Sequence, residues 1–328
     1  MMKLSFRPPM LIAAMIALLV AGCGSTGGTG GTGGAALYKG GRLSIATGNT
    51  TGVYYQLGGG YADLVGRFVP GYQATAETTA ASVENIQRVA RGDSDIAFTL
   101  ADAAADAVQG KNGFSGPQPI RALARLYANH THVIARTDAG IGSVAAMRGK
   151  RVSIGSPNSG TEVIARRLLT AAGIDPRTGI AAQSLSLPET VQGMKDGTLD
   201  AFFWSGGLPT GGVTDLTVSM GDKVTFVPLN DLLPRLRAQY GEVYQAAPLK
   251  KEVYDTPADV PGIAVPNLLI VSTEMPDALA TSLTALLFDH RADLTKVHPE
   301  AANIVRAEAQ KTTPVPLHPG AERYFAKP

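Results

Sequence analysis

One pattern of strand, small-residue loop and helix occurs twice in this chain, about one hundred residues apart. In the first copy, a strand at Leu43 to Ala46 is followed by the loop Thr47 to Gly52 and by apolar residues at helical spacing. In the second, the strand Arg151 to Ile154 is followed by the loop Gly155 to Thr161 and another helix. Strands rich in Val, Ile and Phe that alternate with helices predict an α/β fold with mostly parallel strands flanked by helices.

Individual positions match between the two copies. Ser44 lies 109 positions before Ser153, and Gly52 lies 108 positions before Gly160. Two interpretations remain open: any two strand-loop-helix units look alike, or the chain folds into two similar lobes. The length of 328 residues and an apolar content of 45% suffice for one large core or two modest ones. We expect two lobes joined by two hinge strands, with crossings near Leu126 to Val133 and near Thr225 to Asp231.

The N-terminal segment predicts export. Lys3 and Arg7 precede the apolar run Met10 to Ala21, which is too short for a comfortable membrane span. The run leads to Cys23 in a pattern that resembles the lipobox of bacterial lipoproteins, and Cys23 is the single cysteine of the chain. We therefore expect a signal peptide at 1–22, lipidation of Cys23, and a glycine-rich tether at 23–38.

Charge argues against nucleic acid or an acidic membrane patch as a partner. The chain has 29 basic and 27 acidic residues, and removal of the signal peptide takes away Lys3 and Arg7. The mature protein is then formally neutral when its histidines are uncharged. We expect a lipid-anchored, extracytoplasmic protein, in the periplasm or on the cell surface, that is monomeric.

No sequence motif indicates an enzyme. The segment Gly155 to Gly160 is not a Gly-x-Ser-x-Gly motif, and neither a phosphate-binding nor a dinucleotide-binding glycine pattern occurs. His130 and His132 are two residues apart on a predicted strand and therefore share one face of it. For histidines in such a position, a place on the strand surface is commoner than metal binding. We expect no catalysis, no metal and no cofactor.

Small polar residues stand directly before three predicted helices. The loops are Thr47 to Gly52, Ala81-Ser82, and Ser156 to Thr161. Helix starts carry free backbone N–H groups and partial positive charge, so an anion can bind there without lysine or arginine. Two such starts that face each other would hold a dicarboxylate. Ordinary helix capping is the alternative role for each loop, and Trp204 could either cover a ligand or belong to the core.

Several ordered motifs resemble those of one family, the TAXI solute receptors of TRAP transporters. The resemblance extends from Leu43 to about Ala301 and is carried by the segments Ile45 to Gly58, Ala81 to Ile86, Asp95 to Phe98, Gly160 to Glu162, and Asp200 to Pro209. It implies a type II periplasmic-binding-protein fold with a ligand cleft between the lobes. It also implies delivery of glutamate, 2-oxoglutarate or another C4 or C5 carboxylate to a sodium-coupled membrane permease with fused subunits.

From the loops and the resemblance we expect twelve ligand-binding residues. They are Thr51, Gly52, Val53, Tyr54, Ser82, Asn85, Ser156, Ser159, Gly160, Thr161, Trp204 and Ser205. The expected lobes comprise 39–130 for the first part of lobe 1, 131–228 for lobe 2, and 229–328 for the return to lobe 1. Two other functions stay open: a solute-sensing lipoprotein that signals to a membrane sensor, and an exported hydrolase.

Overall fold

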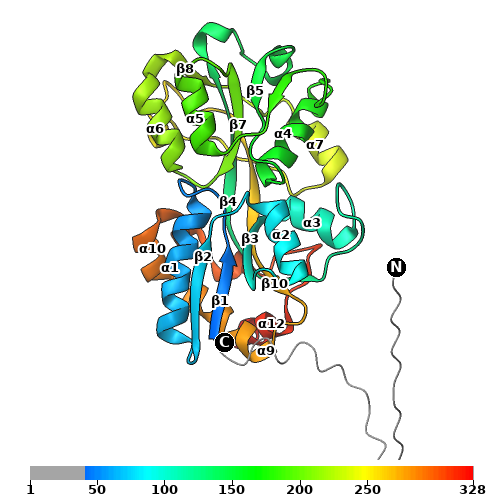
Figure 1. The fold of residues 1–328 in the computed structure, drawn as a ribbon, viewed down its shortest axis with the longest axis vertical. Coiled ribbons are helices and arrows are strands. Elements are labelled where there is room, and N and C mark those ends of the chain that lie inside the picture. The colour runs from blue at the N-terminus through cyan, green and yellow to red at the C-terminus, as the bar shows by residue number, and fades with distance from the viewer. Residues whose placement is uncertain (1–40, 328) are drawn as a thin grey trace, which may run out of the picture.

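The computed structural model describes residues 41–327, so the predicted signal peptide, Cys23 and the tether lie outside the described residues. Two lobes are stacked along the long axis of the molecule and are connected by two long strands (Figure 1). We define the first lobe as residues 41–128 and 267–327, and the second lobe as residues 129–266. No helix among residues 41–327 is long and apolar enough to cross a membrane.

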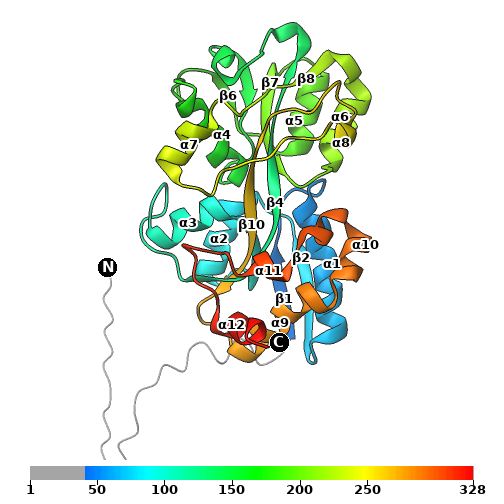
Figure 2. The same cartoon turned by 180° about the vertical axis from the view of Figure 1, so that it is seen from behind.

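The first lobe contains three parallel strands with helices on both sides. Its elements in chain order are β1 (Gly41–Ala46), α1 (Val53–Phe68), β2 (Tyr72–Glu77), α2 (Ser82–Arg91), β3 (Ile96–Leu100) and α3 (Ala101–Gln109). The C-terminal part of the chain adds α9 (Asp277–Asp289), α10 (Arg291–Val297), the 3-10 turn η5 (Pro299–Asn303), α11 (Arg306–Ala309) and α12 (Pro319–Phe325). α9 and α12 lie at the lower end of the lobe in both views, whereas α10 lies beside α1 (Figures 1 and 2).

The second lobe repeats this plan with shorter strands. Its elements are η2 (Thr137–Ala139), η3 (Val144–Met147), β5 (Arg151–Ser153), α4 (Gly160–Ala171), β6 (Ala181–Gln183), α5 (Leu187–Lys195), β7 (Ala201–Gly206), α6 (Gly211–Met220), η4 (Gly221–Lys223), β8 (Val224–Phe226), α7 (Leu233–Tyr240), β9 (Gln245–Ala246) and α8 (Lys251–Tyr254). The parallel strands have the order β2-β1-β3 in the first lobe and β6-β5-β7 in the second. The sequence recurrence therefore reflects one topology that is used twice.

Two antiparallel strands run through both lobes. β4 (Ile120–Arg136) is 17 residues long and pairs with β10 (Ile263–Ser272) over most of its length and with β7 near its end. The complete order β2-β1-β3-β10-β4-β7-β5-β6 makes one sheet. The predicted α/β, two-lobed class with flanking helices is confirmed.

The chain returns to the first lobe later than we predicted. Leu229, Leu232 and Leu236 pack with Leu168 of α4 in the core of the second lobe, so the segment after β8 stays there. The second connection is β10, which starts at Ile263, and not the segment Thr225 to Asp231.

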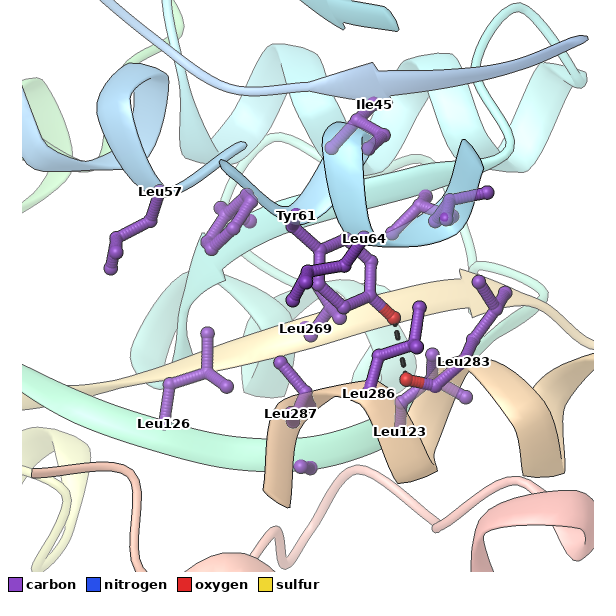
Figure 3. Close-up of a cluster of buried hydrophobic side chains, with 14 of the residues drawn as sticks. Ile45, Leu57, Tyr61, Leu64, Leu123, Leu126, Leu269, Leu283, Leu286 and Leu287 are labelled. Atoms are coloured by element: carbon purple, nitrogen blue, oxygen red, sulfur yellow. Dashed lines mark hydrogen bonds between the residues drawn. The ribbon is translucent and has the colours of Figure 1, made fainter. Parts of the chain in front are cut away.

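Buried aliphatic side chains hold each lobe together. In the first lobe, one face of α1 presents Leu57, Tyr61 and Leu64 to the sheet, and Leu283 of α9 closes the cluster (Figure 3). The hydroxyl of Tyr61 is satisfied inside this core, because it donates to the carbonyl oxygen of Leu283 at 2.6 Å. This packed core fixes the position of α1, whose start faces the second lobe.

Candidate solute-binding site

A cavity lies between the two lobes, where the loops that follow the parallel strands meet. Ligands bind in α/β sheets at the carboxyl ends of the strands, and both lobes turn those ends towards this cavity. Its lining comprises Gly48, Asn49, Gly52, Val53, Tyr54, Ala80, Ala81, Ser82, Leu100, Tyr127, Asn129, Ser156, Ser159, Gly160, Thr161, Trp204, Ser205, Gly206 and Gly207.

Most of the residues expected from the sequence come together here. Those that line the cavity are Gly52, Val53, Tyr54, Ser82, Ser156, Ser159, Gly160, Thr161, Trp204 and Ser205. Thr51 and Asn85 do not line it. Sequence reasoning did not select Tyr127 and Asn129 of β4, because nothing local to a long apolar strand shows which of its residues will face a distant loop.

Asn85 has a structural role, which corrects our expectation. It is fully buried, and its amide nitrogen donates to the carbonyl oxygens of Ala46 (3.3 Å), Thr47 (2.8 Å) and Phe98 (2.7 Å). Its amide oxygen accepts a 2.6 Å hydrogen bond from the hydroxyl of Thr79. Asn85 thus ties α2 to the ends of β1 and β3, and both polar groups of its amide are engaged within the first lobe, away from the cavity.

Thr51 lies against the second lobe beside the cavity. Its hydroxyl oxygen is buried and has no hydrogen-bond partner among residues 41–327. A side chain at Gly212, in the first turn of α6, would come within 3.2 Å of it. Thr51 therefore contacts the facing lobe without lining the cavity.

The starts of α1 and α4 present free amide donors. Gly52 precedes α1 without a side-chain cap, and the N–H groups of Val53 and Tyr54 have no acceptor among the described residues. At α4, the hydroxyl of Ser159 accepts from the N–H of Glu162 at 3.0 Å, which is ordinary capping. The N–H groups of Gly160 and Thr161 have no acceptor within 41–327. One unsatisfied, partially positive helix end from each lobe thus borders the cavity.

The start of α2 is occupied by the protein itself. The N–H groups of Val83 and Glu84 both donate to the carbonyl oxygen of Asn158 in the second lobe, each at 3.1 Å. Asn158 has a φ of 60°, a left-handed conformation that asparagine tolerates better than most residues. We expected the loop before α2 to offer an anion site, but in this closed arrangement the next two amides, those of Val83 and Glu84, bind the facing lobe.

The cavity wall carries no formal charge but contains free hydroxyl groups. All nineteen lining residues are uncharged side chains or glycines. Tyr127 and Ser205 are buried, and neither hydroxyl has a partner among the described residues. Burial raises the pKa of Tyr127 well above its ordinary value, so this hydroxyl stays protonated at neutral pH.

The lobes are closed on each other. The space open to the centre of a water-sized sphere is about 30 Å³, which is room for one or two water molecules. Asn49 of the first lobe accepts a 2.7 Å hydrogen bond from the N–H of Leu187 in the second. On another side, Arg167 of α4 forms ion pairs with Asp102 (3.1 Å) and Asp106 of α3. Entry of a solute therefore requires the lobes to separate.

Two lobes around a cleft and two strands that join them define the fold class of type II periplasmic binding proteins, and solved structures show the same arrangement. The methylphosphonate complex of PhnD1 from Prochlorococcus marinus superposes with a TM-score of 0.55 at 9% identity, over 83% of this chain and 94% of that one. The binding-protein component of an ABC phosphonate transporter from Pseudomonas aeruginosa gives a TM-score of 0.54 at 15% identity, over 80% and 79%. The ligand-binding component of an ABC-type import system from Staphylococcus aureus gives 0.51 at 12% identity, over 88% and 99%.

The family follows from the sequence of the folded region. The model of the NMT1-like family matches residues 45–327, which is nearly all of the part that the structure describes. The chain belongs to the NMT1-like family.

Proposed function

We propose that this protein is an extracytoplasmic solute receptor whose lobes close on a small organic acid. The observation that carries the proposal is the pair of open helix starts, α1 from one lobe and α4 from the other, on one uncharged cavity. A carboxylate gains hydrogen bonds from both lobes only when they are closed, so its binding energy favours the closed state. C4 and C5 acids such as 2-oxoglutarate or glutamate are the first solutes to test.

Substitution of proline at Val53 tests the role of the α1 amides. Val53 is the first residue of α1, where proline is tolerated, and the extended backbone of Gly52 suits a following proline. Val53→Pro removes one N–H donor and leaves the helix intact, whereas Val53→Ala is the matched control for the lost side chain. A hydrogen bond to a charged group contributes about 1.5–3 kcal/mol, so proline should weaken carboxylate binding at least about tenfold relative to alanine.

Calorimetric titration of both variants with a panel of C4 and C5 acids provides the measurement. Thermal unfolding without solute checks that the two variants fold equally well. If acids bind wild type but Val53→Pro and Val53→Ala have the same affinity, the α1 start does not hold the carboxylate. If the folded wild-type chain binds no acid in the panel, the proposal fails.

The location and the anchor are a separate part of the proposal. Lipidation at Cys23 would hold the receptor at the outer face of a membrane while the glycine-rich segment after it gives reach. In cells, Cys23→Ser should release the protein from the membrane fraction and abolish incorporation of a labelled fatty acid. Unchanged fractionation and unchanged labelling would contradict lipid anchoring.

For the membrane partner we propose a sodium-coupled permease with fused subunits, on the sequence resemblance to the TAXI receptors of TRAP transporters. An ABC permease is the second candidate, because proteins with the same fold from Pseudomonas and Staphylococcus are described as components of ABC systems. Uptake of a labelled solute separates the two. A TRAP permease should need a sodium gradient, whereas an ABC permease should need ATP and tolerate sodium ionophores.

A further inference from the structure

The turn η5 of the first lobe is bonded to a loop of the second lobe. Ala301 within η5 and Ile304 directly after it are buried in the core of the first lobe. From this anchored turn, Oε1 of Glu300 accepts a 2.6 Å hydrogen bond from the N–H of Leu208. Leu208 packs against the cluster that contains Val213 and thus belongs to the second lobe. A side chain from the C-terminal part of the chain therefore connects the lobes.

The carboxylate of Glu300 is buried and depends on this bond. It has no ion-pair partner among residues 41–327, and its hydrogen-bond donors there are uncharged N–H groups. Oε1 is bonded to Leu208, and Oε2 accepts from the side-chain amide of Asn303 at 2.7 Å. Since burial of a charge is strongly unfavourable without hydrogen bonds, withdrawal of Leu208 would leave Oε1 unsatisfied. The carboxylate therefore favours the arrangement in which the loop rests against η5.

A second hydrogen bond joins the same two segments. His298, directly before η5, accepts at Nδ1 from the N–H of Glu300 at 3.2 Å, so the neutral ring carries its proton on Nε2. Nε2 lies 3.2 Å from the carbonyl oxygen of Pro209, to which it donates. The first lobe thus bonds the N–H of Leu208 and the carbonyl group of the next residue.

The loop that η5 holds continues the wall of the cavity. Residues 204–207, which we call the wall segment, all line the cavity, and Leu208 follows directly. A Cβ atom built on Gly207 would lie 2.8 Å from Tyr127 and 3.1 Å from Val53, both in the first lobe. It would also lie 3.0 Å from Cγ of Glu300. Because the wall segment fits so closely against the facing lobe, a small shift of the loop changes the shape of the cavity.

Trp204 is tied to the same loop. Its indole N–H donates to the hydroxyl oxygen of Thr210 at 3.0 Å, and this hydroxyl donates to the carbonyl oxygen of Gly207 at 2.7 Å. The indole also approaches the start of α1, since a Cβ atom on Gly52 would lie 3.6 Å from Cζ2 of Trp204. The position of the indole therefore depends on Gly207 and on whatever holds the residues that follow it.

We infer that Glu300 is a positioning residue for solute binding. It does not line the cavity, and it acts through the N–H of Leu208, which fixes the wall segment against the first lobe. The C-terminal turn η5 thereby takes part in closure, although it lies more than ninety positions after the loop that it holds. For its effect on affinity this inference rests on the proposed function, whereas the position of the wall segment can be measured without solute.

Trp204 provides the readout, because it is the single tryptophan of the chain. In the purified full chain without solute, Glu300→Ala should raise the acrylamide quenching constant of the tryptophan fluorescence about twofold, since the wall segment loosens. Calorimetry should show an affinity for 2-oxoglutarate about tenfold lower, as expected for loss of a hydrogen bond to a charged group. Glu300→Gln keeps an acceptor oxygen for Leu208 and should restore most of both properties.

Glu308→Ala is the matched control for loss of a C-terminal carboxylate. Glu308 forms its ion pairs with Arg125 and Lys311, which lie in the first lobe, so the fluorescence quenching and the affinity should both stay at the wild-type level. Thermal unfolding of all variants checks that they fold. If Glu300→Ala does not fold, His298→Ala replaces it, because it removes the bond to Pro209 and should raise the quenching constant in the same direction.

The outcomes separate this inference from the receptor proposal. Equal quenching constants for folded wild type and Glu300→Ala, or for wild type and His298→Ala where that variant replaces it, would overturn the inference. A loss of affinity at unchanged quenching would overturn it as well, because the carboxylate would then not act through the wall segment. If folded wild type binds no C4 or C5 acid, the receptor proposal fails, and the quenching constants still decide whether Glu300 positions the wall segment.

Discussion

A single side chain, Asn85, organises the loops beneath the cavity. Replacement by alanine leaves the carbonyl oxygens that it serves, and the hydroxyl of Thr79, without their partner in a buried place. We predict that Asn85→Ala lowers the free energy of unfolding by about 2–4 kcal/mol, measured by urea denaturation. Loss of solute binding at unchanged stability would instead return Asn85 to the ligand site.

Because His132 is buried, we predict that the folded protein loses stability in mild acid. Burial, and to a smaller extent the neighbouring His130, lowers the pKa of His132 to about 3, against an ordinary 6.5. The unfolded chain therefore binds a proton below pH 6.5 that the folded chain does not, and stability falls as the pH drops from 6.5 towards 3. Between pH 7 and pH 5 this amounts to about 2 kcal/mol for His132 alone.

The check is urea unfolding of wild type and His132→Phe at pH 7, 6 and 5. Phenylalanine suits the site, where the ring of His132 packs against Phe226 and Tyr254. The variant should lose about 2 kcal/mol less than wild type over this range. His290→Gln is the control for histidine removal at a half-buried position on the first lobe. Parallel pH profiles for wild type and His132→Phe would contradict the assignment.

How far the sequence predicts a site residue depends on whether its role is local. Gly52 and Ser159 stand directly before helices, and helix-start chemistry is visible in a short segment. Tyr127 and Ser205 depend on the pairing of β4 with β7, which joins residues about 75 positions apart. For Asn85 the sequence predicted a ligand contact where the structure has none. A polar residue near a helix start gives the same sequence pattern whether its side chain bonds a ligand or buried backbone groups.

At the scale of elements, α4 and α2 meet almost end to end. A Cβ atom built on Gly160 lies 2.5 Å from Leu100 Cδ1 and 2.6 Å from Ser82 Oγ, both in the first lobe. Glycine here permits the lobes to close fully, and a larger residue must displace the side chains of Leu100 and Ser82 to reach the same arrangement.

Gly160→Ala should therefore weaken solute binding about tenfold or more while leaving unfolding without solute nearly unchanged, because the clash exists only in the closed state. Gly59→Ala in α1 is the matched control, since a Cβ there meets nothing within 4 Å. The measurements are the solute affinity and the thermal unfolding temperature of both variants. Wild-type affinity in Gly160→Ala would show that closure does not bring these helix ends together.

At the scale of the whole molecule, Arg167 connects the lobes away from the solute. It lies on α4, is buried, and pairs with Asp102 and Asp106 of α3, while Tyr244 donates to Asp102 at 2.6 Å. Removal of the guanidinium leaves two carboxylates without their positively charged partner in the closed state, which costs about 3–5 kcal/mol in comparable buried pairs.

We predict that Arg167→Met shifts the population towards the open form. The radius of gyration in solution scattering should rise in the absence of solute, and solute affinity should fall. Arg166→Met is the control on the same helix, because the one ion pair of Arg166 among residues 41–327 is with Glu162, one turn away within α4. Identical scattering curves for wild type and both variants would contradict a role of Arg167 in closure.

The lobe boundaries show where sequence reasoning reaches its limit at this scale. The alternation of strands and helices predicts the α/β class, and the recurrence of two loops indicates two lobes. The segment from Leu229 to Tyr244 has apolar residues that would suit either core. Only its packing against α4 assigns it to the second lobe. A contact between residues so far apart in the chain leaves no pattern in the local sequence.

The ladder between β4 and β10 is irregular at two points, between Pro266 and Leu268 and between Leu269 and Ile270. The first of these lies opposite the stretch of β4 that contains Tyr127. Proline offers no N–H there, so the backbone pairing is weaker and bends more easily than its surroundings. This irregular stretch of the ladder and one wall of the cavity are thus neighbours. We expect rotation of the lobes about this stretch to move Tyr127, so that the shape of the cavity and the angle between the lobes change together.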